Sequence, residues 1–148
     1  MTVTFTAATP QDAAGLAAIL RGWIHEMAWM PKLHSPDQDL AFLHHLIATQ
    51  TVIAARLDAA PVGFMALDLA EITCLYFAPA RRGQGVGAGL LDRAKSLTPQ
   101  LAAWTFQANS GARRFYAREG FVEAHLTDGA DNDEHLPDVR LIWERAAP

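Results

Sequence analysis

The chain has 148 residues, of which 51% are hydrophobic, with a formal net charge of −4 and a single cysteine. These values suit one globular domain over residues 1–148 with a sizeable core, and the lone cysteine predicts no internal disulfide. No apolar run is long enough to span a membrane, and the chain does not open like a secretory signal. We therefore expect a cytoplasmic protein with no membrane or nucleic-acid partner.

The first third of the chain predicts a strand followed by two helices. Val3–Ala7 alternates apolar residues with threonine, as in a half-buried strand. Thr9–Pro10 then provides an N-cap and a first helical residue, ahead of an apolar stripe at helical spacing over Leu16–Met27. Ser35–Gln38 has the capping-box pattern that opens a second helix, and Leu40–Ile47 supplies its buried face.

Three strands come next. The apolar runs Val52–Leu57, Val62–Leu69 and Ile72–Phe77 have the length and composition of strands. Asp58 and Pro61 between the first two runs predict a hairpin turn.

The glycine-rich stretch Ala78–Ala88 separates the third strand from an amphipathic helix that ends at Thr98–Pro99. Such a turn exposes backbone N–H groups at the positive end of a helix dipole, where a phosphate or pyrophosphate binds. A turn that only packs the helix tightly on the sheet is the alternative. A P-loop is excluded because Gly87–Gly89 lacks its Lys and hydroxyl, and a dinucleotide fold because Ala102–Ala108 holds no carboxylate.

The last third predicts a strand, a helix and two more strands. These elements are expected at Ala102–Gln107, Ser110–Arg118, Phe121–Thr127 and Val139–Trp143, with Gly120 as the residue that ends the helix. The full order is β-α-α-β-β-β-α-β-α-β-β. It indicates an α/β fold in which helices flank a central mixed sheet.

Two motifs in this order resemble those of the GCN5-related N-acetyltransferase (GNAT) superfamily. Arg82–Gly87 matches its Arg/Gln-x-x-Gly-x-Gly/Ala signature, and Asn109, Tyr116 and Gly120-Phe121 follow at the family's spacing. The resemblance covers nearly the whole chain, and the outer segments are similar to those of a bacterial subfamily. It implies the GNAT fold, acetyl-CoA as the donor, and an N-acetyltransferase that acts in a ternary complex on a primary amine of a small molecule.

The resemblance also implies roles for individual residues. In the family, the strand before the glycine turn separates from the next strand, and pantetheine lies in the gap between them. Backbone groups of Leu75–Phe77 would bind pantetheine, the glycine turn would bind pyrophosphate, and Asn109 would bind the cofactor from the other side of the gap. Tyr116 matches the family's general acid, although a helix aromatic that only packs on the sheet is the alternative. The expected cofactor-binding residues are Leu75, Tyr76, Phe77, Arg82, Gly83, Gln84, Gly85, Val86, Gly87, Ala88, Asn109 and Tyr116.

The general base is less well defined by the motifs. Some family members carry a Glu on the strand before the Asn, but the equivalent residue here is Trp104. Glu71, at the entry to the cofactor strand, is the replacement we favour, and His34 is a weaker candidate. A solvated carboxylate at a strand end is the alternative for Glu71.

Charge is unevenly distributed along the chain. Residues 80–120 hold seven Arg or Lys against Asp92 and Glu119, while the remainder is strongly acidic. A basic segment that spans both motifs suits a phosphorylated cofactor, and we expect its countercharge to come from Arg81, Arg82, Arg113 and Arg114. A solvated helix face is the alternative for each of these arginines.

The acceptor site is predicted near the loop between the first two helices, Ala28–His34. The many apolar and aromatic residues of this loop suit either a loop that lines the substrate site or a plug that covers the core. The acidic segment Asp128–Asp138 either attracts a cationic amine or is a solvated loop. The candidate acceptor-pocket residues are Trp29, Met30, His34 and Trp104.

Two other activities remain open: acetylation of a protein or peptide amine, and a non-catalytic acyl-CoA sensor. The histidines show no metal-ligand spacing, so no metal is expected. Cys74 alternates with apolar residues on its strand, which favours packing over nucleophilic chemistry. The late strands offer sheet edges at which a homodimer can form.

Overall fold

The computed structural model describes residues 2–78, 81 and 84–146. In chain order the elements of this part are β1 (Val3–Ala7), α1 (Ala13–Glu26), α2 (Pro36–Thr49), β2 (Thr51–Leu57), β3 (Ala60–Asp68), β4 (Glu71–Phe77), α3 (Val86–Leu97), β5 (Gln100–Phe106), α4 (Ser110–Arg118), β6 (Val122–Thr127) and β7 (Asp138–Glu144). The predicted order of helices and strands is therefore confirmed. No helix among these residues is both long and apolar enough to cross a membrane.

The strands form a seven-stranded sheet in the order β1-β2-β3-β4-β5-β7-β6. Every neighbouring pair is antiparallel except β4 and β5, which are parallel. The predicted mixed sheet is thus confirmed. Its one parallel pair joins the antiparallel β1–β4 half to the antiparallel β5–β7–β6 half.

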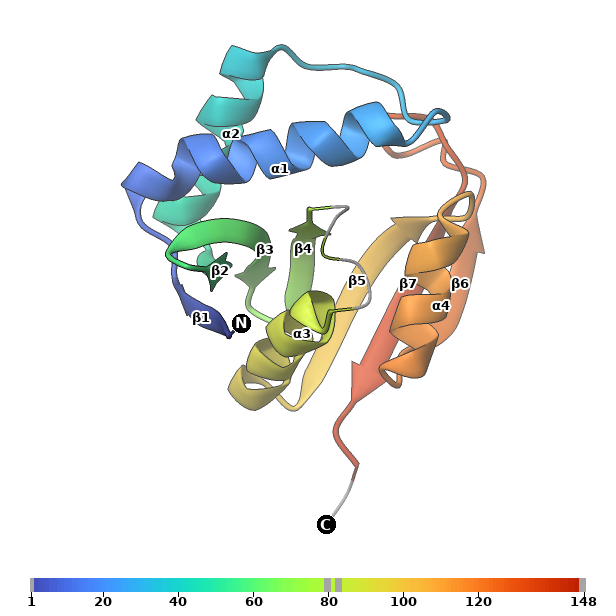
Figure 1. The fold of residues 1–148 in the computed structure, drawn as a ribbon. Coiled ribbons are helices and arrows are strands. Elements are labelled where there is room, and N and C mark those ends of the chain that lie inside the picture. The colour runs from blue at the N-terminus through green and yellow to red at the C-terminus, as the bar shows by residue number, and fades with distance from the viewer. Residues whose placement is uncertain (1, 79–80, 82–83, 147–148) are drawn as a thin grey trace.

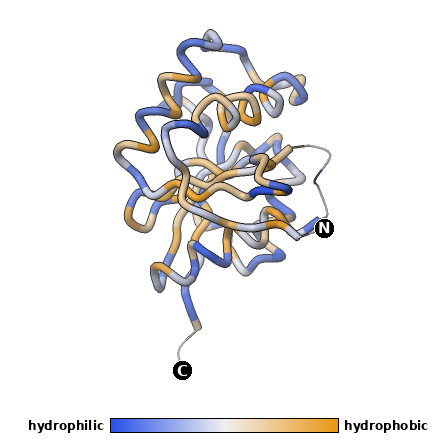
Figure 2. The backbone as a smooth tube through the Cα atoms, turned by 60° about the vertical axis from the view of Figure 1, so that its left-hand side comes forward, coloured by the Kyte–Doolittle hydropathy of each residue, from blue (hydrophilic) through white to orange (hydrophobic). Residues whose placement is uncertain are grey.

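Helices cover the two faces of the sheet differently. In Figure 1, α3 and α4 lie in front of the sheet, and α1 runs across the top of the view beside α2. One core joins α1 and α2 to β2, β3 and β4 around the fully buried Phe64, and the other joins α3 to β2, β3, β5 and β7 around Met65 and Leu90. Figure 2 shows hydrophobic stretches running through the middle of the molecule, and β3 is buried along most of its length, as a strand covered on both faces must be.

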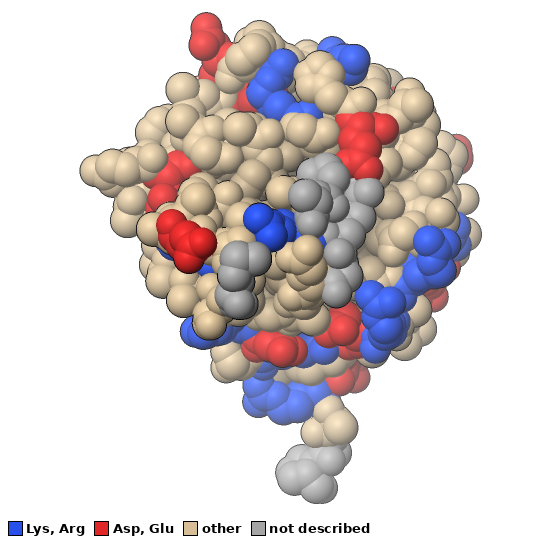
Figure 3. Space-filling model, in the orientation of Figure 1, with Lys and Arg blue, Asp and Glu red and all other residues tan. Residues whose placement is uncertain are grey.

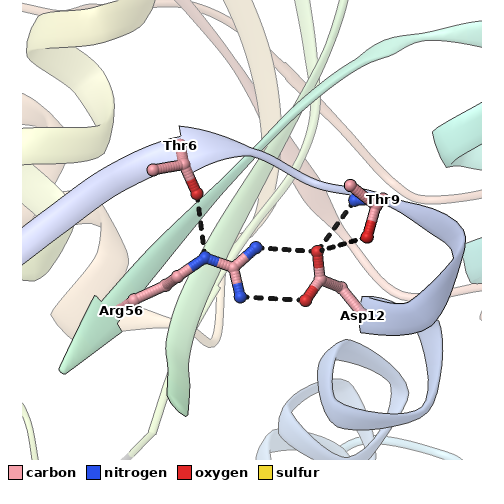
Figure 4. Close-up of polar contacts among 4 residues, drawn as sticks. All are labelled: Thr6, Thr9, Asp12 and Arg56. Atoms are coloured by element: carbon pink, nitrogen blue, oxygen red, sulfur yellow. Dashed lines mark hydrogen bonds and ion pairs between the residues drawn. The ribbon is translucent and has the colours of Figure 1, made fainter. Parts of the chain in front are cut away.

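The start of α1 differs slightly from the prediction. Pro10–Asp12 forms a short 3₁₀ turn, so the α-helix begins at Ala13. The Thr9 N–H donates a hydrogen bond to Asp12 Oδ2 at 2.8 Å. Arg56 on β2 donates hydrogen bonds to both oxygens of the same carboxylate, at 2.9 and 2.7 Å (Figure 4). This contact ties the start of α1 to the sheet.

Local turn chemistry explains the other boundaries. Ser35 and Gln38 form the predicted capping box, with bonds of 3.1 Å to Ser35 Oγ and 2.7 Å to Gln38 Oε1. Gly120 ends α4 with a φ of 94°, as predicted. Pro61 lies within β3, opposite Arg56 at a β-bulge, and not in the hairpin turn where it was expected.

Candidate active site

The parallel strands β4 and β5 separate soon after they begin, and the separation forms a cleft. They pair only at Glu71–Ala102 and Ile72–Ala103. Further along, β4 continues to pair with β3 while β5 pairs with β7. The cleft between them has a volume of about 590 Å³ and is also lined by the first residues of α3 and by α4.

The start of α3 presents backbone donors to this cleft. Gly85 precedes the helix with a φ of 79°, and a Cβ added there would meet no heavy atom within 4 Å. The next three residues, Val86, Gly87 and Ala88, also line the cleft. Because the first N–H groups of a helix have no intrahelical acceptor, this end suits an anionic group.

Most of the residues predicted to bind the cofactor meet at the cleft. Gln84 is exposed and accepts a hydrogen bond from Arg81 Nη1 at 3.4 Å. Arg82 and Gly83 lie outside the residues that the structure describes. Those that line the cleft are Leu75, Tyr76, Phe77, Gly85, Val86, Gly87, Ala88, Asn109 and Tyr116.

Two phenols reach the cleft from the two cores. Tyr76 packs with the core under α1, and Tyr116 packs with the core under α3. Burial raises the pKa of both phenols above its ordinary value, and the nearby Cys74 thiol adds to the effect. Each phenol therefore stays protonated through the neutral range. Burial also raises the pKa of Cys74 to about 12, so its thiol is a poor nucleophile.

Asn109 stands between β5 and α4. Its Oδ1 accepts a hydrogen bond from the Ala112 N–H at 3.1 Å and so caps the helix. The remaining function of the side chain is its amide nitrogen, which is a donor. A donor at the cleft wall suits a carbonyl or phosphate oxygen of a bound molecule.

Aromatic rings line the cleft on the side of α1. Trp23 lies 5.1 Å from the ring of Tyr76 and 5.9 Å from that of Trp29, and Trp29 lies 5.6 Å from the ring of Phe106. The sequence indicated Trp23 only as part of the apolar stripe of α1, and Phe106 only as a strand residue. Their place in the site depends on how α1 crosses the sheet.

The four candidate acceptor residues fall into two groups. Trp29 and Trp104 line the cleft. Met30 and His34 line a separate hollow of about 50 Å³, together with Glu134 from the β6–β7 loop. The α1–α2 loop therefore contributes Trp29 to the cleft, and Met30 and His34 to a neighbouring hollow.

Glu71, the candidate base, is held by an ion pair. Its Oε2 and Oε1 accept hydrogen bonds from Nη1 and Nη2 of Arg140 on β7, both at 2.7 Å. The Arg140 guanidinium in turn lies 5.1 Å from the ring centre of Trp104. Both carboxylate oxygens of Glu71 are therefore engaged by the arginine, and Glu71 is not among the residues that line the cleft, so this geometry disfavours Glu71 as a base.

The arginines predicted to neutralise the cofactor phosphates fall into two groups. Arg81 and Arg114 line the cleft, together with Arg118. Arg113 instead forms a bidentate ion pair with Glu123, in which both hydrogen bonds are 2.8 Å long. Among the residues that the structure describes, Figure 3 shows basic and acidic side chains interspersed over the face drawn there.

The acidic β6–β7 loop has a fixed backbone. Asn132 Nδ2 donates to Leu136 O at 2.8 Å and to Asp138 Oδ2 at 3.1 Å, and Thr127 Oγ1 donates to Asp138 Oδ1. Gly129 has a φ of 83°, and a Cβ there would lie 2.1 Å from Leu136 O. The loop is thus built on specific contacts, while its side chains Asp128, Asp131 and Asp133 are exposed.

The sequence and structure are similar to those of known proteins. The family model of the acetyltransferase (GNAT) domain matches residues 48–123. The peptidyl-lysine N-acetyltransferase YjaB of Salmonella typhimurium is 34% identical over 83 residues, which are 56% of this chain and 57% of that protein. The chain therefore matches little more than half the length of this curated relative.

Solved structures share the fold over nearly the whole chain. A GCN5-related N-acetyltransferase from Rhodopseudomonas palustris superimposes with a TM-score of 0.81 at 25% identity, covering 97% of this chain and 96% of that one. The yncA protein of Salmonella typhimurium, solved with its cofactor acetyl-CoA, has a TM-score of 0.76 at 18% identity, covering 100% and 98%. The fold predicted from the two motifs is confirmed.

Proposed function

The chain belongs to the GNAT family of acetyltransferases, and on that basis we propose that it transfers an acetyl group from acetyl-CoA to a primary amine. The observation that carries the proposal is the cleft between β4 and β5, which has the start of α3 at its wall. An elongated thioester with a pyrophosphate needs such a combination of a gap between strands and a helix N-terminus.

The residues around the cleft fit acetyl-CoA. The open space at Gly85 and the first amides of α3 suit its pyrophosphate, and Arg81 and Arg114 supply positive charge beside it. Backbone groups of Leu75–Phe77 lie where β4 has no partner strand on its cleft side, so they are available to pantetheine. When bound, acetyl-CoA supplies the acetyl group as an activated thioester.

Tyr116 is the proposed general acid. Its raised pKa keeps the proton on Oη at neutral pH, where the leaving sulfur requires one. The raised pKa also makes the phenol a weaker acid than a free one. Tyr116 therefore acts best when the sulfur comes within direct hydrogen-bonding reach.

The acceptor is proposed to be a small primary amine, with a peptidyl lysine as the second candidate. The small amine suits the aromatic wall of Trp23, Trp29 and Phe106, which can enclose an alkyl chain. The name of the YjaB relative favours the lysine of a peptide. The half-exposed Trp104 beside the cleft supports the same candidate, because it leaves that side open to a larger molecule.

Thermal unfolding with acetyl-CoA, combined with an assay of thiol release, tests the proposal. Saturation at about 100 times the Kd stabilises a protein by roughly 2.7 kcal/mol when the ligand binds only the native state. We expect a clear rise in Tm, followed by thiol release when an amine from a panel of small amines and lysine peptides is added. A rise in Tm without thiol release from any amine would favour an acyl-CoA sensor. No rise at all would refute the cofactor site.

A further inference from the structure

Trp104 belongs both to the cleft and to an open face of the sheet. Side chains alternate along β5, so Trp104 shares a face with Ala102 and Phe106, opposite the core residues Leu101 and Ala103. Trp29 covers Phe106 at 5.6 Å, but Trp104 is 46% exposed although it also lines the cleft. A large apolar ring is therefore available to solvent at the cleft mouth.

Two charged residues hold this ring in place. Arg140 is the direct partner of Trp104 across the β5–β7 ladder, and its guanidinium lies 5.1 Å from the ring centre. Both of its terminal nitrogens donate to Glu71 at 2.7 Å, so the arginine is fixed from β4 as well. The three residues come from three strands and form one rigid unit, which we name the Trp104 platform.

The same face continues as a partly apolar surface. Ile142 on β7 pairs with Ala102 on one side and with Val122 on the other, and Val122 is 66% exposed. The end of this face next to Phe106 borders the β6–β7 loop, since Asp138 pairs with Phe106. Asp128, Asp131 and Asp133 of that loop are exposed, so its charge complements a cationic molecule.

We propose that the Trp104 platform binds an extended, lysine-containing peptide, which makes the second candidate, a peptidyl lysine, an acceptor of this cleft alongside a small amine. The methylenes of the lysine side chain cross the indole into the cleft, and an apolar neighbour lies toward Val122 and Ile142. This inference rests on the proposed acetyltransfer and names the acceptor class within it. Glu71 and Arg140 are then positioning residues, because their ion pair neutralises the arginine that would otherwise repel the lysine ammonium.

The test compares a lysine peptide with a small alkylamine as acceptors in the same thiol-release assay. Trp104→Ala is expected to raise the KM of the peptide at least tenfold, with kcat within about twofold, and to raise it by a clearly larger factor than the KM of the small amine, which meets only the part of the ring that lines the cleft. Trp104→Phe, which keeps a flat ring, is expected to retain most of the peptide affinity. Phe42→Ala, which removes a half-exposed aromatic residue on α2, is the matched control.

Glu71→Gln separates positioning from base catalysis. As a positioning residue, Glu71 affects mainly the KM of the peptide, and the variant keeps the wild-type pH profile with the small amine. As a base, it would lower kcat for every amine and alter the acidic limb of the profile. Folding of each variant is checked by its Tm and by its Kd for acetyl-CoA.

The outcomes separate the two proposals. If the wild type acetylates small amines but no peptide, or if Trp104→Ala affects both acceptors equally, the platform is refuted and the acetyltransfer stands. If the wild type acetylates neither acceptor, the proposed function fails and the platform fails with it. A peptide-selective rise in KM supports both.

Discussion

The ion pair between Asp12 and Arg56 is expected to make a large contribution to stability. Arg56 binds both carboxylate oxygens, at 2.9 and 2.7 Å, and its Nε donates to Thr6 Oγ1 at 2.8 Å (Figure 4). The two charged side chains are only 17% and 13% exposed. Since this contact fixes the start of α1, it also supports the helix that brings Trp23 to the cleft.

The magnitude follows from the pKa of the carboxyl group. The hydrogen bond from Arg56 is the main cause that lowers the pKa of Asp12 from 3.8 to about 2. One pKa unit corresponds to about 1.4 kcal/mol, so the lowered pKa represents roughly 2 kcal/mol. Because the folded pKa lies below the unfolded one, this stabilisation is present above about pH 4 and is lost as the pH falls toward 2.

Asp12→Asn should therefore lower the free energy of unfolding by roughly 2 kcal/mol at pH 7, or the Tm by about 4–8 °C for a chain of this size. Urea unfolding of both proteins between pH 7 and pH 2 measures it, and their stabilities should converge at the acidic end. Glu123→Gln is the control, since the Arg113–Glu123 pair has similar geometry but side chains 32% and 33% exposed, and should cost at most about 1 kcal/mol. Equal losses in the two variants, or a difference that persists unchanged at pH 2, would refute the reasoning.

Three further predictions concern the cleft. Tyr116→Phe should lower kcat by about 10²-fold or more without weakening acetyl-CoA binding, and an unchanged kcat would remove the general-acid role. Because burial raises the pKa of Tyr116, its ionisation should cause no loss of kcat as the pH rises from 7 to about 9. Gly87→Ala should weaken acetyl-CoA binding about tenfold, as measured by calorimetry, because the new Cβ would lie 3.0 Å from Phe115 Cζ at the cleft wall. Gly22→Ala on α1 is its control, since a Cβ there would meet nothing within 4 Å. This control should leave binding unchanged and stabilise the fold by up to about 1 kcal/mol. Cys74 should react with a thiol reagent only on unfolding, because its thiol is buried and its pKa is raised to about 12; fast labelling of the native protein would contradict this.

Features that depend on local chemistry could be predicted from the sequence. The capping box at Ser35, the end of α4 at Gly120 and the strand–turn–helix at the start of α3 each need only a few adjacent residues. The two motifs also placed Asn109 and Tyr116, which the structure brings to the same cleft as Gly85. Their roles in binding and catalysis remain predictions.

Features that depend on the order of strands could not be predicted. Glu71 and Arg140 are 69 residues apart, and they meet only because β7 lies next to β5 in the sheet. Arg113 is likewise diverted from the cleft by Glu123 on β6. The sequence shows these charged residues but not their ion-pair partners. The partner decides whether a charged side chain is available to bind a ligand.

The ion pair of Glu71 bears on how the acceptor amine loses its proton. An alkyl ammonium has a pKa of about 10.4 in water. An enzyme that works at neutral pH must therefore favour the uncharged form of the amine that it binds. We propose that the wall of Trp23, Trp29 and Phe106 excludes water from an amine bound against it, and desolvation lowers the pKa of an amine. An amine buried against these rings can therefore release its proton to solvent at the cleft mouth, without a carboxylate dedicated to the task. This proposal fits a site in which Trp104 stands where the family resemblance allows a carboxylate and in which Glu71 is bound to Arg140.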